Sequence, residues 1–145
     1  MGTHRLSKIW ITFRTYGYYS TGRTFRWWRE RERIVKAVRF MRKVVGENLS
    51  GIEIVGLDRK GMARTYTRED EVPRKMNLRG ILITLKNPLE VTYTEEYAKI
   101  YSPIDNFLMD LRMPLYNMWG YGEKGPCWQM DGRHIHLDEK VRSTR

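Results

Sequence analysis

Two histidines separated by one residue are the side chains of this chain best suited to holding a metal ion. His134 and His136 flank Ile135. Residues two apart in a β-strand point to the same side, so both imidazoles could bind one ion. Such a pair, with a tyrosine nucleophile from the segment 16–19, could nick DNA. Only His4 remains as a third histidine ligand, so a His-pair metal-dependent nicking enzyme is the third of three hypotheses, and no metal ligand is assigned.

The single cysteine excludes an internal disulfide and offers a second kind of chemistry. Cys127 follows Gly125 and Pro126 and precedes Trp128. The positive charge of Lys124 would favour its thiolate, which could then act as a nucleophile. The alternative, a small and partly buried side chain, stays open because the sequence has no cysteine-protease signature.

A polar segment after an expected strand contains the candidates for phosphate binding. Arg59, Lys60 and Arg64 surround Gly61. Arginine and lysine in such a loop could hold a phosphate through charge-assisted hydrogen bonds. The segment has no Walker pattern, and a solvated turn is the alternative interpretation.

One acid interrupts an otherwise apolar helical stripe. Asp110 lies between Phe107 and Leu111. A carboxylate at the margin of a cleft could act as a general base. The alternative is a helix-edge carboxylate paired with Arg112 or Lys99.

The charge is concentrated at the N-terminal end. The chain has 145 residues and a formal net charge of +10. Residues 1–50 hold 12 Lys or Arg and 3 Asp or Glu, a balance of +9, which leaves +1 for the remainder. This asymmetry favours a polyanionic partner, although a solvated helix face is the alternative. The candidates for nucleic-acid contact combine cations with stacking rings: Arg23, Arg26, Trp27, Trp28, Arg31 and Arg33.

The N-terminal half contains the clearest elements. Alternation over residues 7–16 predicts a strand with Ile9, Ile11 and Phe13 on one face. A turn at 16–22 and a return strand at 24–28 would complete a hairpin, so residues 1–29 are a possible basic appendage. The apolar spacing over 30–45 predicts an amphipathic helix that ends at Gly46.

The second half is predicted with more interruptions. We expect strands over 52–57 and 80–86 joined through a tight turn at 58–61, the second strand ending at Asn87-Pro88 because proline lacks the amide that a ladder needs. A capping box at Thr92 predicts a helix to about Tyr101. A fresh helix with a buried stripe from 104 to 118 follows, kinked or ended by Pro114. The glycines beyond Gly120 indicate a loop-rich end.

Taken in order, these motifs resemble the first part of a thymidylate synthase or of the related dCMP hydroxymethylases. That family has a helix leading to an Asp-Arg-Thr-Gly turn, then a helix with an acid, and then a Tyr-Gly pair, a tryptophan and, in some members, Asp-Gly-Arg-His-Ile. The similarity covers roughly residues 34–136. The matching segments are Asp58-Arg59-Lys60-Gly61, Asp110, Tyr121-Gly122, Trp128 and Asp131-Gly132-Arg133-His134-Ile135.

The resemblance implies a pyrimidine deoxynucleotide-binding protein. Arg59 and Arg64 would hold the phosphate, and Asp110, Tyr121 and Trp128 would line the pocket. Asp110, Tyr121 and Cys127 are the residues it offers for catalysis. Complete catalysis would require methylene-tetrahydrofolate and a thiol, but Cys127 does not stand in the family's Pro-Cys-His context, so we expect an incomplete catalytic apparatus.

The whole chain is predicted to form a single domain, 1–145, of the α/β (α+β) class, with a mixed or antiparallel sheet packed by two main helices. No apolar run reaches the length that spans a bilayer, so we expect a cytoplasmic protein without a membrane partner, acting as a homo-oligomer or with a partner chain. A thymidylate-synthase-like nucleotide-binding protein is the leading hypothesis, and a non-enzymatic, basic nucleic-acid-binding protein is the second.

Overall fold

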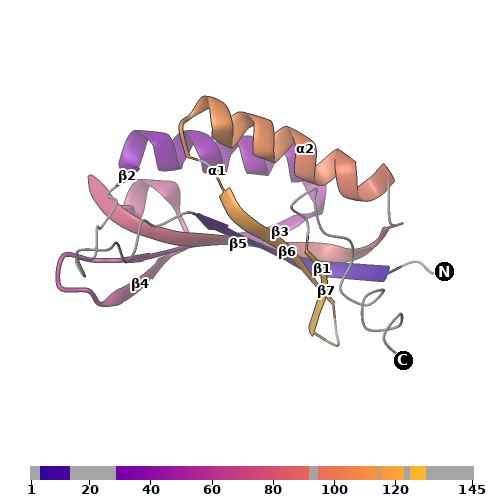
Figure 1. The fold of residues 1–145 in the computed structure, drawn as a ribbon. Coiled ribbons are helices and arrows are strands. Elements are labelled where there is room, and N and C mark those ends of the chain that lie inside the picture. The colour runs from indigo at the N-terminus through magenta and orange to yellow at the C-terminus, as the bar shows by residue number, and fades with distance from the viewer. Residues whose placement is uncertain (1–3, 14–28, 92–94, 114, 123–124, 130–145) are drawn as a thin grey trace, which may run out of the picture.

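The computed structural model describes residues 4–13, 29–91, 95–113, 115–122 and 125–129. They form one antiparallel sheet with both helices on the same face (Figure 1). The elements are β1 (His4–Phe13), β2 (Arg29–Glu30), α1 (Arg31–Val45), β3 (Leu49–Leu57), β4 (Ala63–Tyr66), β5 (Lys75–Val91), α2 (Glu95–Asp110), β6 (Leu115–Gly122) and β7 (Gly125–Gln129), with 3₁₀ turns η1 (Gly46–Asn48) and η2 (Glu69–Glu71).

The strand order is β4-β3-β5-β1-β6-β7, and β2 pairs with β5 beyond the end of β1. Strands β3, β5, β1 and β6 with the two helices form a β-α-β-β-α-β arrangement of the split, ferredoxin-like kind. The fold is therefore α+β with an antiparallel sheet and two helices, as the sequence predicts. Because both described helices cover the same face, no helix of the described residues lies over the other face of the sheet.

Strand β1 lies at the centre of the sheet, paired with β5 on one side and β6 on the other. Its side chains Ile9, Ile11 and Phe13 are buried, which confirms the predicted alternation. The hypothesis that residues 1–29 form an appendage is wrong for the residues of β1, because the core forms around them. The predicted turn and return strand, 16–28, lie outside the described residues.

Helix α1 confirms the helix predicted over 30–45. Ile34, Ala37, Val38 and Met41 are completely buried, so the three- and four-residue spacing marks the face toward the core. Gly46 ends the helix with a positive φ of 69°, and its amide donates to the carbonyl of Arg42. Glycine adopts this conformation without the steric cost that a side chain would add.

Strand β5 is longer than expected and passes through Pro88, so the predicted end at Asn87-Pro88 is wrong. On the β1 side, Thr84 pairs with Lys8 and Leu89 with Leu6, so residues 85–88 oppose a single β1 residue. Proline is tolerated at such an irregularity because no ladder amide is needed there. At the neighbouring Asn87, the Asn48 side chain forms the hydrogen bonds to the backbone. Its Oδ1 accepts from the Asn87 amide at 2.8 Å, and its Nδ2 donates to the Asn87 carbonyl at 2.9 Å.

Helix α2 replaces the two helices predicted over 92–101 and 104–118. It runs without a break from Glu95 to Asp110 with Pro103 inside. The chain then turns through Arg112, whose φ is +56°. The expected capping box at Thr92 lies outside the described residues.

The last part of the predicted stripe, Leu115 and Met118, belongs to β6 rather than to a helix. Leu115 pairs with Phe13 and Met118 with Ile11, and the register shifts between Thr12 and Phe13. This bulge inserts Tyr116, so two buried strand residues stand three apart. Their spacing imitates a helix, which explains the wrong prediction. Residues beyond Gly120 are likewise not only loop, because β7 pairs with β6 and Gly122 lies opposite Gly125.

The helices contact each other as well as the sheet. The Phe40 ring of α1 stacks on the Phe107 ring of α2, with ring centroids 4.1 Å apart and planes 4° from parallel. Arg42 ties α1 to η2, donating from Nη2 to Glu69 Oε1 at 2.7 Å. Within the described residues, these contacts hold the helical layer together above one face of the sheet.

Candidate nucleic-acid interface

Two tryptophans lie next to each other on the sheet face opposite the helices. Trp10 of β1 pairs directly with Trp119 of β6, and on its other side with Leu82 of β5. Directly opposed residues of an antiparallel pair have Cβ atoms about 4.5–5.5 Å apart. Both tryptophans are partly exposed, so two tryptophans and a leucine occupy neighbouring positions on this face.

The position of the Trp10 ring depends on a glycine. A Cβ atom on Gly80 would lie 2.6 Å from Trp10 Cζ2 and 2.8 Å from the carbonyl oxygen of Ile11. The indole therefore occupies the space above Gly80, across the neighbouring strand. A ring that lies over the sheet in this way offers an aromatic surface to a ligand.

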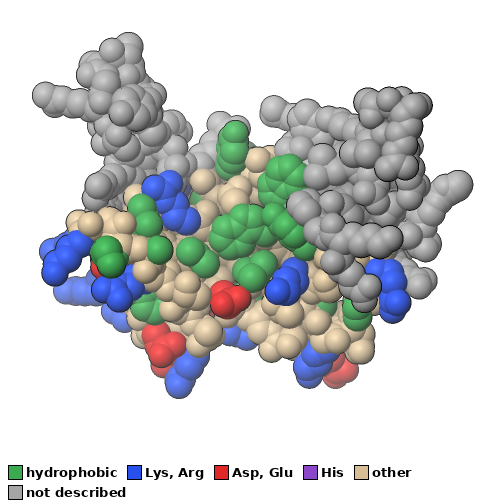
Figure 2. Space-filling view, turned by 90° about the horizontal axis from the view of Figure 1, so that it is seen from below, with side chains coloured by type: hydrophobic (Ala, Val, Ile, Leu, Met, Phe, Trp, Pro, Cys, Tyr) green, Lys and Arg blue, Asp and Glu red, His purple; other side chains and the backbone are tan. Residues whose placement is uncertain are grey.

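Polar side chains surround this apolar row. On one side, exposed Lys8 pairs with Tyr121 of β6 and with Thr84 of β5. On the other, Thr12 Oγ1 accepts from the amide of Asn117 at 3.1 Å, which secures β6 next to its bulge. Figure 2 shows hydrophobic side chains gathered in the middle of this face, with lysine and arginine side chains beside them and toward the margins, where acidic side chains also occur.

One carboxylate extends the apolar row. Glu53 of β3 pairs with Leu82 and is partly exposed. A negative charge there repels phosphate groups but can accept a hydrogen bond from an amino group of a base. The middle of the face thus combines aromatic and apolar side chains with one hydrogen-bond acceptor.

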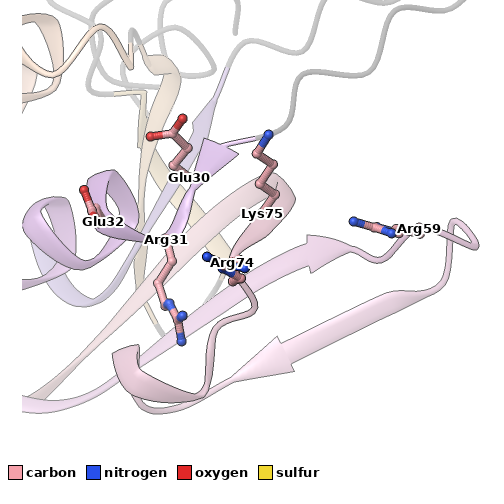
Figure 3. Close-up of a pocket in the computed structure, with 6 residues that line it drawn as sticks. All are labelled: Glu30, Arg31, Glu32, Arg59, Arg74 and Lys75. Atoms are coloured by element: carbon pink, nitrogen blue, oxygen red, sulfur yellow. The ribbon is translucent and has the colours of Figure 1, made fainter.

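A cavity of about 580 Å³ opens at the beginning of β5. Figure 3 shows cationic side chains that reach it from separate segments: Arg31 at the start of α1, Arg59 in the β3–β4 hairpin, and Arg74 and Lys75 at the start of β5. Glu30 and Glu32 complete the described lining. Their carboxylates point away from the Arg31 guanidinium (Figure 3).

The β3–β4 hairpin that carries Arg59 is held by an aspartate. Asp58 Oδ1 accepts from the amides of Lys60 and Met62, each at 2.9 Å. The hydrogen bond from Met62 and the nearby Arg64 guanidinium lower the pKa of Asp58. Gly61 has a φ of 80°, which completes the tight turn predicted over 58–61.

The structure separates the residues that the resemblance would place in one pocket. Arg64 lies on β4, where its Nε donates to Asp58 Oδ2 at 3.2 Å. Tyr121 lies on β6, four strand spacings and about 19 Å from β4. Asp110 ends α2 and is exposed, so within the described residues it lines no cleft.

Some of the other predicted residues lie near one another in the fold, and the rest lie outside the described residues. Tyr121 is adjacent to β7, the strand that contains Cys127 and Trp128. Arg31 lines the cavity, and Arg33 follows it in α1. The remaining candidates lie outside the described residues: Arg23, Arg26, Trp27, Trp28, His134 and His136.

The predicted site residues do not include the two paired tryptophans, Trp10 and Trp119. Alternation sets Trp10 on the side opposite Ile9 and Ile11, within the basic N-terminal part expected to contact a polyanion, but nothing local in the sequence pairs it with Trp119. Trp119 was hidden by the helix expected through residue 118. In the described ranges, no group of three or more His, Cys, Asp or Glu side chains could hold a metal ion, and no helix is long and apolar enough to cross a bilayer.

Comparisons with known proteins find no match for this chain. No protein-family model, no curated protein and no solved structure matches it.

Proposed function

We propose that this protein binds single-stranded nucleic acid across the sheet face opposite its helices. The observation that carries the proposal is the direct cross-strand pair of Trp10 and Trp119. Aromatic side chains stack on unpaired bases of any sequence, and each stacked base contributes about 1–3 kcal/mol. A four-stranded sheet that presents aromatic rings to bases is a recurrent solution for single strands.

The charges of the molecule favour the same ligand. A net charge of +10 attracts a polyanion. Exposed Lys8 stands beside the aromatic row, where it can meet a phosphate, while Glu53 disfavours phosphate over the middle of the face. Duplex DNA fits less well, because its bases are already paired and stacked, whereas single strands expose them.

The experiment compares variants in binding to a labelled oligothymidine of about 12 nucleotides. Trp10→Ala and Trp119→Ala should each weaken binding about 5- to 150-fold, the loss of one stacked base. Trp10→Phe should retain much of the affinity because it keeps a ring. Fluorescence anisotropy measures the dissociation constants, and circular dichroism checks that each variant is folded.

Met109→Ala is the matched control, because Met109 is a large apolar side chain, 59% exposed, on α2. It should bind as the unmodified protein does. Folded Trp10→Ala and Trp119→Ala proteins with unchanged affinity would contradict the proposal.

Pyrimidine deoxynucleotide binding stays a prediction from the resemblance. It is tested by a thermal-shift titration with dUMP and dCMP. Ligand at 100 times its dissociation constant should stabilise the fold by about 2.7 kcal/mol. The separation of Arg64 from Tyr121 gives this hypothesis less geometric support than the aromatic face gives to nucleic acid.

A further inference from the structure

We infer that the cavity at the start of β5 is a phosphate-binding site, which holds the backbone of a strand as it leaves the aromatic face. The assignment to a strand rests on the proposed function. The same chemistry would also hold the phosphate of a free nucleotide, so the test below separates these two sources.

Cationic side chains outnumber acidic ones among the described residues that line the cavity. Four cationic side chains line the cavity against two acids, and in the part of the chain that the structure describes no ion pair joins these cations to an acidic side chain. The lining residues of the described chain therefore carry a net positive charge, which attracts an anion. Arginine matches phosphate geometry through paired hydrogen bonds.

The backbone that carries these cations is fixed by hydrogen bonds and strand pairing. The Arg31 amide donates to the Arg74 carbonyl at 2.9 Å. Lys75 is fixed by its pairing with Glu30 of β2, and Arg59 by the Asp58 hairpin. A site whose backbone is set before the ligand arrives loses less entropy on binding.

The position of the cavity along β5 and its volume also suit a phosphate group of a nucleic-acid strand. Lys75 and Leu82 belong to the same strand, seven residues and about 23 Å apart. A strand that stacks on Trp10 would need to span about this distance along β5 to place a phosphate in the cavity. Its volume, about 580 Å³, falls within the range of about 300–1,000 Å³ typical of small-ligand sites.

The experiment uses Arg59→Ala, Arg74→Ala and Lys75→Ala in the full chain. The controls are Lys36→Ala and Lys43→Ala, exposed cations of α1 that do not line the cavity. Binding of an oligothymidine of about 12 nucleotides is measured over a range of salt concentrations. Each cavity variant should reduce the log–log salt slope by about 0.7, the loss of one phosphate contact on a single strand, and the controls should not.

A short oligothymidine of about 4 nucleotides separates this proposal from the function on which it rests. On the short ligand, Trp10→Ala should still weaken binding, whereas the cavity variants should not. A second outcome is that the cavity variants weaken binding of the long oligothymidine while Trp10→Ala weakens binding of neither oligothymidine. This result would support the phosphate site and overturn the proposal that the aromatic face binds bases.

Inorganic phosphate and dUMP identify the source of the phosphate. Saturable binding of dUMP by calorimetry, abolished in Arg59→Ala, would assign the site to a free nucleotide. If both small anions bind weakly and the cavity variants still weaken binding of the long oligothymidine, the site would be assigned to the phosphate backbone of a nucleic-acid strand. Salt slopes of all three cavity variants equal to those of the controls, with no dUMP or phosphate binding, would overturn the inference.

Discussion

At the scale of single residues, a glycine makes the aromatic surface possible. Trp10 lies across the neighbouring strand because Gly80 has no side chain. The sequence gives no sign of this role for Gly80. It indicates only that Gly80 begins the strand predicted over 80–86. The residue that shapes the site is thus one that offers no chemistry of its own.

Gly80→Ala should therefore both destabilise the fold and weaken nucleic-acid binding. The added Cβ meets the carbonyl oxygen of Ile11 as well as the Trp10 ring, and backbone atoms cannot move aside cheaply. Overpacking of this kind costs about 1–3 kcal/mol, measured by urea unfolding.

The matched control is Gly51→Ala in β3, where a Cβ has no neighbour within 4 Å. Its free energy of unfolding should change by no more than about 0.5 kcal/mol. Equal stability and equal affinity of the two variants would show that Gly80 does not position Trp10.

At the scale of elements, an ion pair joins α1 to the turn before β5. Burial alone would raise the pKa of Glu69, but the hydrogen bonds from Arg42 outweigh it and hold the pKa below its ordinary value. A carboxyl with a lowered pKa stabilises the fold where it is ionised. Its contribution is present above about pH 4.5 and is lost as the pH falls through the lowered pKa.

Glu69→Gln should consequently lower the free energy of unfolding by about 0.5–1 kcal/mol at pH 7. The difference from the unmodified protein should shrink as the pH falls below the ordinary pKa of Glu69. Asp70→Asn is the control, because Asp70 and its partner Arg68 are 69% and 71% exposed. A pH-independent difference would show that the ion pair is not the cause.

How far the elements could be predicted depends on the kind of signal. Helix α1 and strand β1 follow from regular periodicity, and the 58–61 turn from Asp58 and Gly61. Strand β6 could not be predicted, because its bulge gives Leu115 and Met118 a helical spacing. The length of β5 also escaped prediction, since Pro88 is tolerated only where the partner strand provides the irregularity.

At the scale of the whole molecule, the antiparallel α+β class could be predicted, but the strand order could not. Composition and charge indicate a polyanionic partner, yet they place its contacts in the N-terminal third. The aromatic row instead combines residues far apart in the sequence, Trp10, Leu82 and Trp119. Only the long-range register of the sheet brings them together, and no local pattern encodes that register.

The central position of β1 also decides which experiments are informative. A deletion of residues 1–30 would remove a strand paired on both sides, so any loss of binding would report unfolding. Point variants on the sheet face avoid this difficulty.

The most direct measurement is a titration of the protein with oligothymidine, followed through the indole N–H signals of its five tryptophans by nuclear magnetic resonance. Tryptophan-to-phenylalanine variants assign the signals. The signals of Trp10 and Trp119 should shift together, and the shifts should saturate with the dissociation constant found by anisotropy. Unshifted Trp10 and Trp119 signals at a saturating concentration of oligothymidine would contradict it.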